Sequence, residues 1–159
     1  RINRFRFWNA KGEYQRYHPK YFHLIPQLFH LWNKTGRNGL TAPVYGDGST
    51  TRSWIDVNDI ASGVLHVALN PDVWSDVWNI GGTATGGEHP TEEIIEAFWA
   101  GLGTQVTKEY KPDIPGGQSI IMNTTKIQTI RWQPVMTIKE SMRRAAEGYK
   151  LHGLDSRVS

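Results

Sequence analysis

Residues 44–59, VYGDGSTTRSWIDVND, constrain the fold of this chain more than any other stretch. Asp47-Gly48 predicts a tight turn, because glycine tolerates positive φ and the aspartate side chain can bond the backbone ahead of it. A short β-prone run from Trp54 to Val57 follows the turn. Arg52 is therefore expected where a turn meets a strand, with a guanidinium free to hold a phosphate or carboxylate through two hydrogen bonds.

A helix is predicted directly after this run. Asn58 or Asp59 would cap it, since a short polar side chain can accept from the free backbone amides of a first helical turn. Asn70-Pro71 would end it, because the residue before a proline avoids helical geometry. Its apolar residues fall on one stripe: Ile60, Val64, Leu65 and Ala68.

The rest of the chain alternates strand and helix patterns, which is typical of an α/β fold. Further strands are expected over residues 4–9, 77–80, 105–110 and 120–123. One helix would carry Pro26 in its first turn and close at Thr35-Gly36. A second would be capped by Thr91 and end at Gly101 or Gly103, with a buried face of Ile94, Ile95, Phe98 and Leu102.

The last predicted helix begins at a capping box formed by Thr137 and Glu140. Its buried face is expected to contain Ile138, Met142, Ala145, Ala146 and Tyr149. Residues 152–159 are expected to form a frayed tail.

Composition narrows the class of protein without fixing it. The 159 residues suffice for one compact domain with a real core. The net charge of +3 permits anionic ligands but does not require nucleic acid. The chain has no cysteine, which excludes disulfides and thiolate chemistry and favours a cytoplasmic location. No apolar run approaches the ~20 residues of a membrane helix. The start at Arg1 rather than at a methionine predicts a fragment or excerpt of a longer protein.

The stretch from Val44 to Asp59 resembles the nucleotide-binding segment of the extended short-chain dehydrogenases/reductases that act on nucleotide-sugars, such as UDP-glucose 4-epimerases and dTDP-glucose 4,6-dehydratases. The family pattern is V-[YF]-G-D-G-x-x-x-R-D-[FYW]-[IL]-x-V-x-D, and Ser53 stands where the family usually has aspartate. The resemblance extends in order from Arg6 to Tyr149. It implies the last strands of a doubly wound, Rossmann-like parallel sheet plus a smaller α/β substrate-binding lobe.

The resemblance also assigns candidate site residues near the start of the chain. Residues 6–12 are similar to the family motif R-[YF]-F-N-x-x-G, which implies that Phe7 and Trp8 flank the cofactor and that Asn9 contacts the substrate. His23 and Leu24 begin a segment similar to [NHK]-L-[IM]-P, whose backbone amides approach the nucleotide. Without the resemblance, Asn9 would be read as opening a turn after an edge strand.

Three further residues are assigned in the same way. Val44 and Tyr45 are implied contacts of the nucleobase, and Arg52 of the diphosphate. Tyr45 taken alone would be ordinary packing. The family usually carries R-x-G-D where this chain has the residues IPGG at 114–117, so one expected phosphate contact is missing unless Lys111 replaces it.

Two elements of the family's chemistry do not occur in the chain: the G-x-x-G-x-x-G turn that holds the dinucleotide, and the Tyr-x-x-x-Lys pair that removes a proton from the sugar hydroxyl. Residues 1–151 are therefore interpreted as the C-terminal, nucleotide-sugar-binding half of such an enzyme, with no catalytic residue of their own. NAD, or alternatively NADP, would be bound mainly by an N-terminal half outside this chain. The chain alone is expected to be inactive, and the full-length enzyme a homodimer.

Other functions remain open at this stage. The first alternative is a non-catalytic module that binds a nucleotide-sugar, which could be a UDP-, dTDP-, GDP- or ADP-sugar. A second is a nucleic-acid-binding domain, suggested by aromatic residues interleaved with basic ones: Arg1, Arg4, Arg6, Lys11, Arg16 and Lys20. A metal site is not predicted, because His18, His23 and His30 lack the i, i+4 spacing of a helical zinc pair.

Overall fold

Four separate strand pairs form the β structure of this computed structural model, which describes residues 2–18, 20, 23–35, 41–113 and 118–154. Three pairs are parallel: β1 (Arg4–Phe7) with β6 (Val77–Ile80), β2 (Ala10–Lys11) with β5 (Ile55–Asp56), and β3 (Thr41–Tyr45) with β8 (Thr107–Lys111). The fourth pair, β4 (Thr51–Ser53) with β7 (Glu88–Pro90), is antiparallel. Parallel pairs joined through helices confirm the predicted α/β class.

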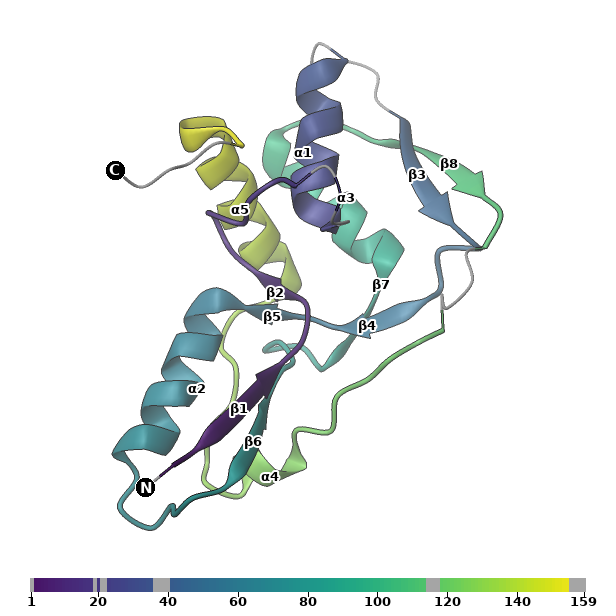
Figure 1. The fold of residues 1–159 in the computed structure, drawn as a ribbon. Coiled ribbons are helices and arrows are strands. Elements are labelled where there is room, and N and C mark those ends of the chain that lie inside the picture. Colours follow the sequence, from purple (N-terminus) through teal and green to yellow (C-terminus); the bar gives the residue numbers. More distant parts are fainter. Residues whose placement is uncertain (1, 19, 21–22, 36–40, 114–117, 155–159) are drawn as a thin grey trace.

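Five helices alternate with these strands (Figure 1). They are α1 (Leu24–Lys34), α2 (Val57–Leu69), α3 (Thr91–Leu102), α4 (Thr125–Gln128) and α5 (Ile138–His152). None of the helices within the described residues has both the length and the apolar composition needed to cross a membrane.

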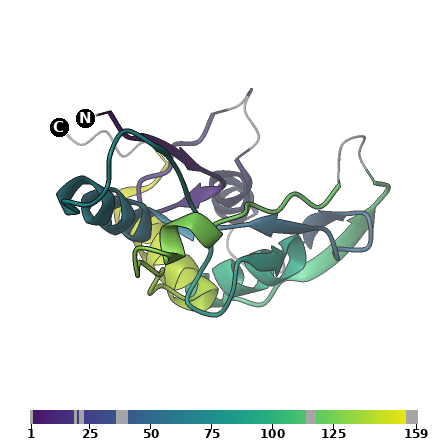
Figure 2. The ribbon, with the colours of Figure 1, turned by 90° about the horizontal axis from the view of Figure 1, so that it is seen from below.

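The side chains bury two hydrophobic clusters. The larger one joins α1, α3 and α5 to the inner face of β3, through residues such as Phe29, Phe98 and Tyr149. The smaller one joins α2, β6 and α4, through Ile80, Ile127 and Trp132. Figure 2 shows α2 at one end of the molecule and the β3–β8 pair at the other. The chain between them, β4 followed by β5, passes from one cluster to the other.

The expected faces of α3 and α5 are confirmed. All the predicted core positions of both helices are buried. The Thr137 hydroxyl accepts from the Glu140 amide at 3.1 Å, as in a capping box, although the Glu140 carboxylate bonds to Arg143 instead of reaching back. Gly103 ends α3 with φ +77°, a conformation that glycine adopts without strain.

The predicted caps of two helices are wrong by one to three residues. Asp56 caps α2, because its carboxylate accepts from the Asn58 amide at 2.8 Å. Asp59 is buried and instead accepts from the amides of Val135 and Met136, both at 3.0 Å. Thr91 is the first residue of α3 rather than its cap, and its hydroxyl bonds the Thr50 carbonyl at 3.2 Å.

The strand predicted over residues 120–123 does not form. Ile120 makes one isolated parallel bridge with Arg52, and α4 begins soon afterwards. The reason is that the Met122 amide donates to the Ser53 hydroxyl at 2.7 Å rather than to a neighbouring strand. α5 ends at His152, and Leu154 packs against the larger cluster. Gly36, the turn at 37–39, the IPGG segment at 114–117 and the end of the tail at 155–159 lie outside the described residues.

Lys11 is buried in β2, with only 5 % of its surface exposed. Its Nζ lies 4.3 Å from the centroid of the Trp54 ring and forms no ion pair within the described residues. Burial lowers the pKa of the Lys11 amine from 10.5 to about 7. The unfolded chain therefore binds more protons than the folded chain between about pH 7 and pH 10.5.

Stability should consequently rise as the pH increases from 7 to 9.5. The slope contributed by Lys11 is at most about 1.4 kcal/mol per pH unit, the value for one proton. Lys11→Met should remove this contribution and raise stability most at pH 7 and below, where burial of the charge costs most. Urea unfolding followed by tryptophan fluorescence at several pH values measures both effects, with the exposed Lys34→Met as control. Equal pH slopes in the wild type and in Lys11→Met would contradict the prediction.

Candidate functional site

Two predicted substrate contacts from distant parts of the sequence lie beside each other. β1 ends at Phe7, and Asn9 then turns the chain with φ +43°, in the left-handed region that asparagine tolerates better than most residues. The Asn9 side-chain amide donates to the Ser53 carbonyl at 3.0 Å. Ser53 follows Arg52 directly, so the contact brings the candidate substrate residue Asn9 next to the candidate phosphate residue Arg52.

Arg52 is the central residue of β4 and is half-buried. Its Nη1 donates to the carbonyl of the preceding Thr51 at 2.9 Å. Within the described part of the chain it forms no ion pair with a carboxylate. A guanidinium carries five N–H donors in a planar fork. Most of these donors are therefore left for a ligand.

Ser53 shows how the chain accommodates its departure from the family pattern. The side chain is 2 % exposed, and its hydroxyl accepts from the Met122 amide at 2.7 Å. The backbone of the same residue exchanges a hydrogen bond with Ile120, whose carbonyl accepts from the Ser53 amide at 3.3 Å. A neutral hydroxyl satisfies this buried amide without adding a buried charge.

The predicted cofactor contacts, Phe7 and Trp8, lie at the carboxyl end of β1. They are 52 % and 45 % exposed. With Arg6, Asn79 and Met122 they line an open hollow of about 500 Å³. Ligands of open parallel α/β sheets bind beyond the carboxyl ends of the strands, so the hollow is on the expected side of the β1–β6 pair.

The predicted nucleotide contacts of α1 and β3 lie on other elements of the structure. His23 is exposed and precedes α1, and no side chain caps the free amides of that helix start. Val44 is 1 % exposed and packs in the larger cluster, so only its backbone can meet a ligand. Tyr45 points the other way and is 40 % exposed. No hydrogen bond among the described residues joins His23, Leu24, Val44 or Tyr45 to Arg52.

A tight turn connects Tyr45 to β4. The Asp47 carboxylate accepts from both the hydroxyl and the amide of Ser49, at 2.5 and 2.9 Å, as the Asp-Gly signal predicts. The Ser49 hydroxyl, followed by its amide, holds the pKa of Asp47 below its usual range. Gly46 and Gly48 have φ values of +70° and +81°. The turn thus places a carboxylate that already has hydrogen-bond partners between the candidate base and phosphate contacts.

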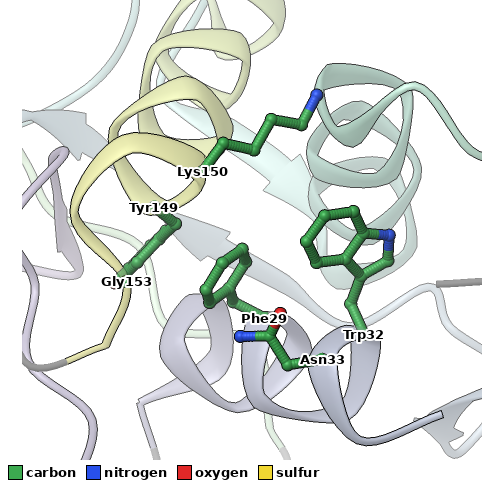
Figure 3. A pocket seen from close by; sticks show the side chains of 6 residues that line it. All are labelled: Phe29, Trp32, Asn33, Tyr149, Lys150 and Gly153. Carbon is green, nitrogen blue, oxygen red and sulfur yellow. The ribbon is translucent and has the colours of Figure 1, made fainter. Parts of the chain in front are cut away.

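A second hollow, of about 490 Å³, is lined by residues of α1 and α5 and by Gly153, and by none of the predicted site residues. Figure 3 shows the rings of Phe29 and Tyr149 side by side, at a centroid separation of 4.9 Å, and Lys150 extending towards α3. The Lys150 ammonium donates to the Gly101 carbonyl at 3.1 Å, which satisfies a free carbonyl at the end of α3. This hollow is accounted for by helix packing.

A polar cluster with two buried members, Thr83 and His89, lies next to β4 and was not predicted from the sequence. It consists of Thr83, His89 and Glu93, joined in that order by hydrogen bonds. The only signal in the sequence was the four-residue spacing of His89 and Glu93, which is common by chance. No group of three or more side chains that could hold a metal occurs in the parts of the chain that the structure describes.

Comparison with known proteins places these features in a class. The model of the family described as NAD dependent epimerase/dehydratase matches residues 3–81. The low-salt glycan biosynthesis protein Agl12 of Haloferax volcanii is 32 % identical over 84 % of this chain and 41 % of its own length. The probable GDP-L-fucose synthase 1 of Oryza sativa subsp. japonica is 28 % identical over 89 % of this chain and 42 % of its own.

The dTDP-glucose 4,6-dehydratase of Bacillus anthracis, solved in complex with NAD, has a similar structure. Its TM-score is 0.68 at 27 % identity, over 94 % of this chain and 44 % of the other. Fold and motifs together define an α/β chain of the extended short-chain dehydrogenase/reductase class. It belongs to the NAD-dependent epimerase/dehydratase family. It spans about two fifths of the length of the curated relatives it matches.

The positive φ of Asn9 leads to a prediction on stability. Asn9→Gly should lose only the bond to the Ser53 carbonyl, whereas Asn9→Ala should also pay the cost of a left-handed backbone. That cost is roughly 1–2 kcal/mol for an ordinary residue. Asn9→Ala should therefore unfold at a lower urea concentration than Asn9→Gly. The reverse order would show that the turn relaxes to an unstrained backbone in the alanine variant.

Proposed function

We propose that this chain grips the diphosphate of a nucleotide-sugar within an NAD-dependent sugar epimerase or 4,6-dehydratase. The single observation that carries the proposal is the Arg52 guanidinium, which has no carboxylate partner in the described structure and lies beside Asn9. Relatives named UDP-glucose 4-epimerase, GDP-L-fucose synthase and dTDP-glucose 4,6-dehydratase support the substrate class. UDP-, dTDP-, GDP- and ADP-sugars all carry the diphosphate that an arginine would hold.

Each candidate residue has a defined task in this proposal. Arg52 binds two phosphate oxygens through its fork of N–H groups, which fixes the substrate's orientation. Asn9 keeps one amide N–H and its Oδ1 for the sugar or the diphosphate, since its other N–H is held by Ser53. The uncapped amides at the start of α1 add donors for an anion. Tyr45 offers an exposed ring on which a nucleobase can stack.

The cofactor is also part of the proposal. The exposed rings of Phe7 and Trp8 around the hollow at the end of β1 fit the apolar face of a nicotinamide ring. NAD, or NADP, would supply hydride transfer at this place, while Phe7 and Trp8 would exclude water from one side of it. The homodimer and the cytoplasmic location stay predictions.

Arg52→Ala in the complete enzyme should weaken binding of the nucleoside diphosphate by roughly 1.5–3 kcal/mol, the range for a hydrogen bond to a charged group. Calorimetric titration with UDP, dTDP, GDP and ADP in turn measures the loss and identifies the base. Arg143→Ala is the matched control, because Arg143 forms exposed ion pairs on α5 that contribute little. Unchanged nucleotide affinity together with a large loss of stability would make Arg52 a structural residue.

A second prediction concerns the free edge of β1. β6 pairs with one side of β1, and no described residue pairs with the other. Since unpaired strand edges and exposed aromatic rings favour association, the isolated 159-residue chain should self-associate and turn over no nucleotide-sugar with NAD. Adding an N-terminal NAD-binding half, in the same chain or as a separate one, should give a monodisperse, active particle.

Light scattering, amide hydrogen exchange and turnover assays of the isolated chain test this prediction. A monodisperse monomer with protected amides in β1 and β6 would favour the non-catalytic binding module instead. Measured turnover by the isolated chain would overturn the assignment of the catalytic residues to another part of the enzyme.

A further inference from the structure

The Thr83–His89–Glu93 cluster lies beside the strand that carries Arg52, on its antiparallel partner β7. His89 is the central residue of β7 and is 6 % exposed. Its Nε2 shares a hydrogen bond of 2.9 Å with the Thr83 hydroxyl, and its Nδ1 one of 2.8 Å with the Glu93 carboxylate. Because an ionised carboxylate only accepts, Nδ1 carries the proton in the second bond. Both ring nitrogens of this buried imidazole therefore have fixed partners.

The cluster is tied to β4 through the backbone of His89. In the antiparallel pair of β4 and β7, His89 is the residue opposite Arg52. The carbonyl of His89 accepts from the Trp54 indole N–H at 3.3 Å, two residues beyond Arg52. At the other end, the Thr91 amide donates to the Thr50 carbonyl at 3.0 Å. The backbone on both sides of Arg52 is thus fastened to the segment that contains His89.

A sheet of two three-residue strands cannot hold its own geometry, since two-stranded ribbons are marginal in water. The position of β7 must come from other elements. The His89 side chain supplies two of them, because Thr83 belongs to the turn after β6 and Glu93 to the first turn of α3. Two backbone hydrogen bonds close this turn. The Thr83 amide donates to the Gly86 carbonyl at 2.7 Å, and the Gly86 amide donates to the Thr83 carbonyl at 3.1 Å.

The order hydroxyl, imidazole, carboxylate is also that of a nucleophile relay. Two observations oppose a nucleophilic role for Thr83. The residue is only 7 % exposed, and its hydroxyl, which has a single proton, lies within hydrogen-bond distance of both the Gly86 carbonyl, at 2.7 Å, and His89 Nε2, at 2.9 Å. A nucleophile needs its oxygen open to a substrate. The cluster is a support and not a second active site.

We infer that His89, held by Thr83 and Glu93, is a positioning residue that fixes Arg52 for diphosphate binding. The inference rests on the proposed function of Arg52 and extends it to a second layer of residues. An arginine that meets a diphosphate through two bonds needs its Cα placed within a fraction of an ångström. Loss of the hydrogen bonds of His89 would allow β7 to shift and to displace Arg52 with it, while the hydrophobic clusters stay intact.

The test is a double-mutant cycle in the complete enzyme, with UDP, dTDP, GDP or ADP as probe, whichever binds. Thr83→Val and Glu93→Met each remove one hydrogen-bond partner of His89 with little change of shape. Each should raise the Kd of the nucleotide roughly 3- to 10-fold, the size expected for residues that share one hydrogen-bond network. In the Arg52→Ala background the same substitutions should change the Kd by less than about twofold, because the residue they position is gone.

Controls separate positioning from general destabilisation. Thr83→Ser restores the hydroxyl and should restore affinity. Glu96→Met, on the same helix but paired with Lys108, should leave the Kd unchanged. Should Thr83→Val fail to fold, Glu93→Met carries the same test, since the Glu93 side chain is 49 % exposed and tolerates change.

The outcomes distinguish this inference from the proposal on which it rests. If Arg52→Ala weakens binding but Thr83→Val and Glu93→Met do not, the positioning role is wrong and the proposed function stands. Effects of equal size with and without Arg52 would likewise overturn the role. If no nucleotide binds, or if Arg52→Ala has no effect, the proposed function itself fails and takes this inference with it.

Discussion

Two buried carboxylates at the start of α2 hold the two hydrophobic clusters together. Asp56 accepts from Asn58 on its own helix and from the Ser141 hydroxyl of α5 at 2.6 Å. Asp59 accepts from the amides of Val135 and Met136, in the segment that leads into α5. Both carboxylates lie at the positive end of the α2 dipole, where a negative charge is favoured. Without these bonds, little but β4 and β5 would join α2 to the larger cluster.

The candidate site lies where the chain passes between the clusters. Trp54 packs in the larger cluster, and Ile55, the next residue, packs in the smaller one. Arg52 precedes this crossing by two residues, and Asn9, which follows β1, donates to the carbonyl of the intervening Ser53. The two candidate ligand contacts, Arg52 and Asn9, therefore lie on or beside a segment that both hydrophobic clusters hold in position. The site owes its geometry to burial on either side of it, more than to contacts among its own residues.

Local patterns predicted the buried faces of α3 and α5 because their signals are local, but not that of α2, where Leu65 and Ala68 are exposed and Val67 is buried. The stripes of α3 and α5 repeat every three to four residues, and each buried position follows from that period alone. The choice of cap for α2 could not be made in this way, because Asp56, Asn58 and Asp59 are all suitable side chains. Only the fold decides that Asp59 is needed elsewhere, by backbone amides some 76 residues away in sequence.

The geometry of the candidate site was predicted only in part, because some of its contacts are not local in sequence. The motif placed Arg52 at the end of a turn, but the bond between Asn9 and Ser53 spans 44 residues and has no local signature. The burial of Lys11 was missed because its neighbours in sequence, Ala10, Gly12 and Glu13, form no apolar pattern that would predict a buried position. His89 was missed because its partners come from a turn and from a helix. In each case a tertiary contact, absent from any window of sequence, sets the chemistry of the residue.

The crossing at Trp54 and Ile55 has a mechanical consequence. If the two clusters rock against each other, the peptide between these residues lies close to the axis of that motion. Atoms near a rotation axis are displaced least. Arg52 precedes Ser53 in the chain, and Asn9 is hydrogen-bonded to the Ser53 carbonyl. The distance between Arg52 and Asn9 would therefore change little, while α2 and α3 would be displaced further. In such a motion the outer helices would be displaced more than the candidate site.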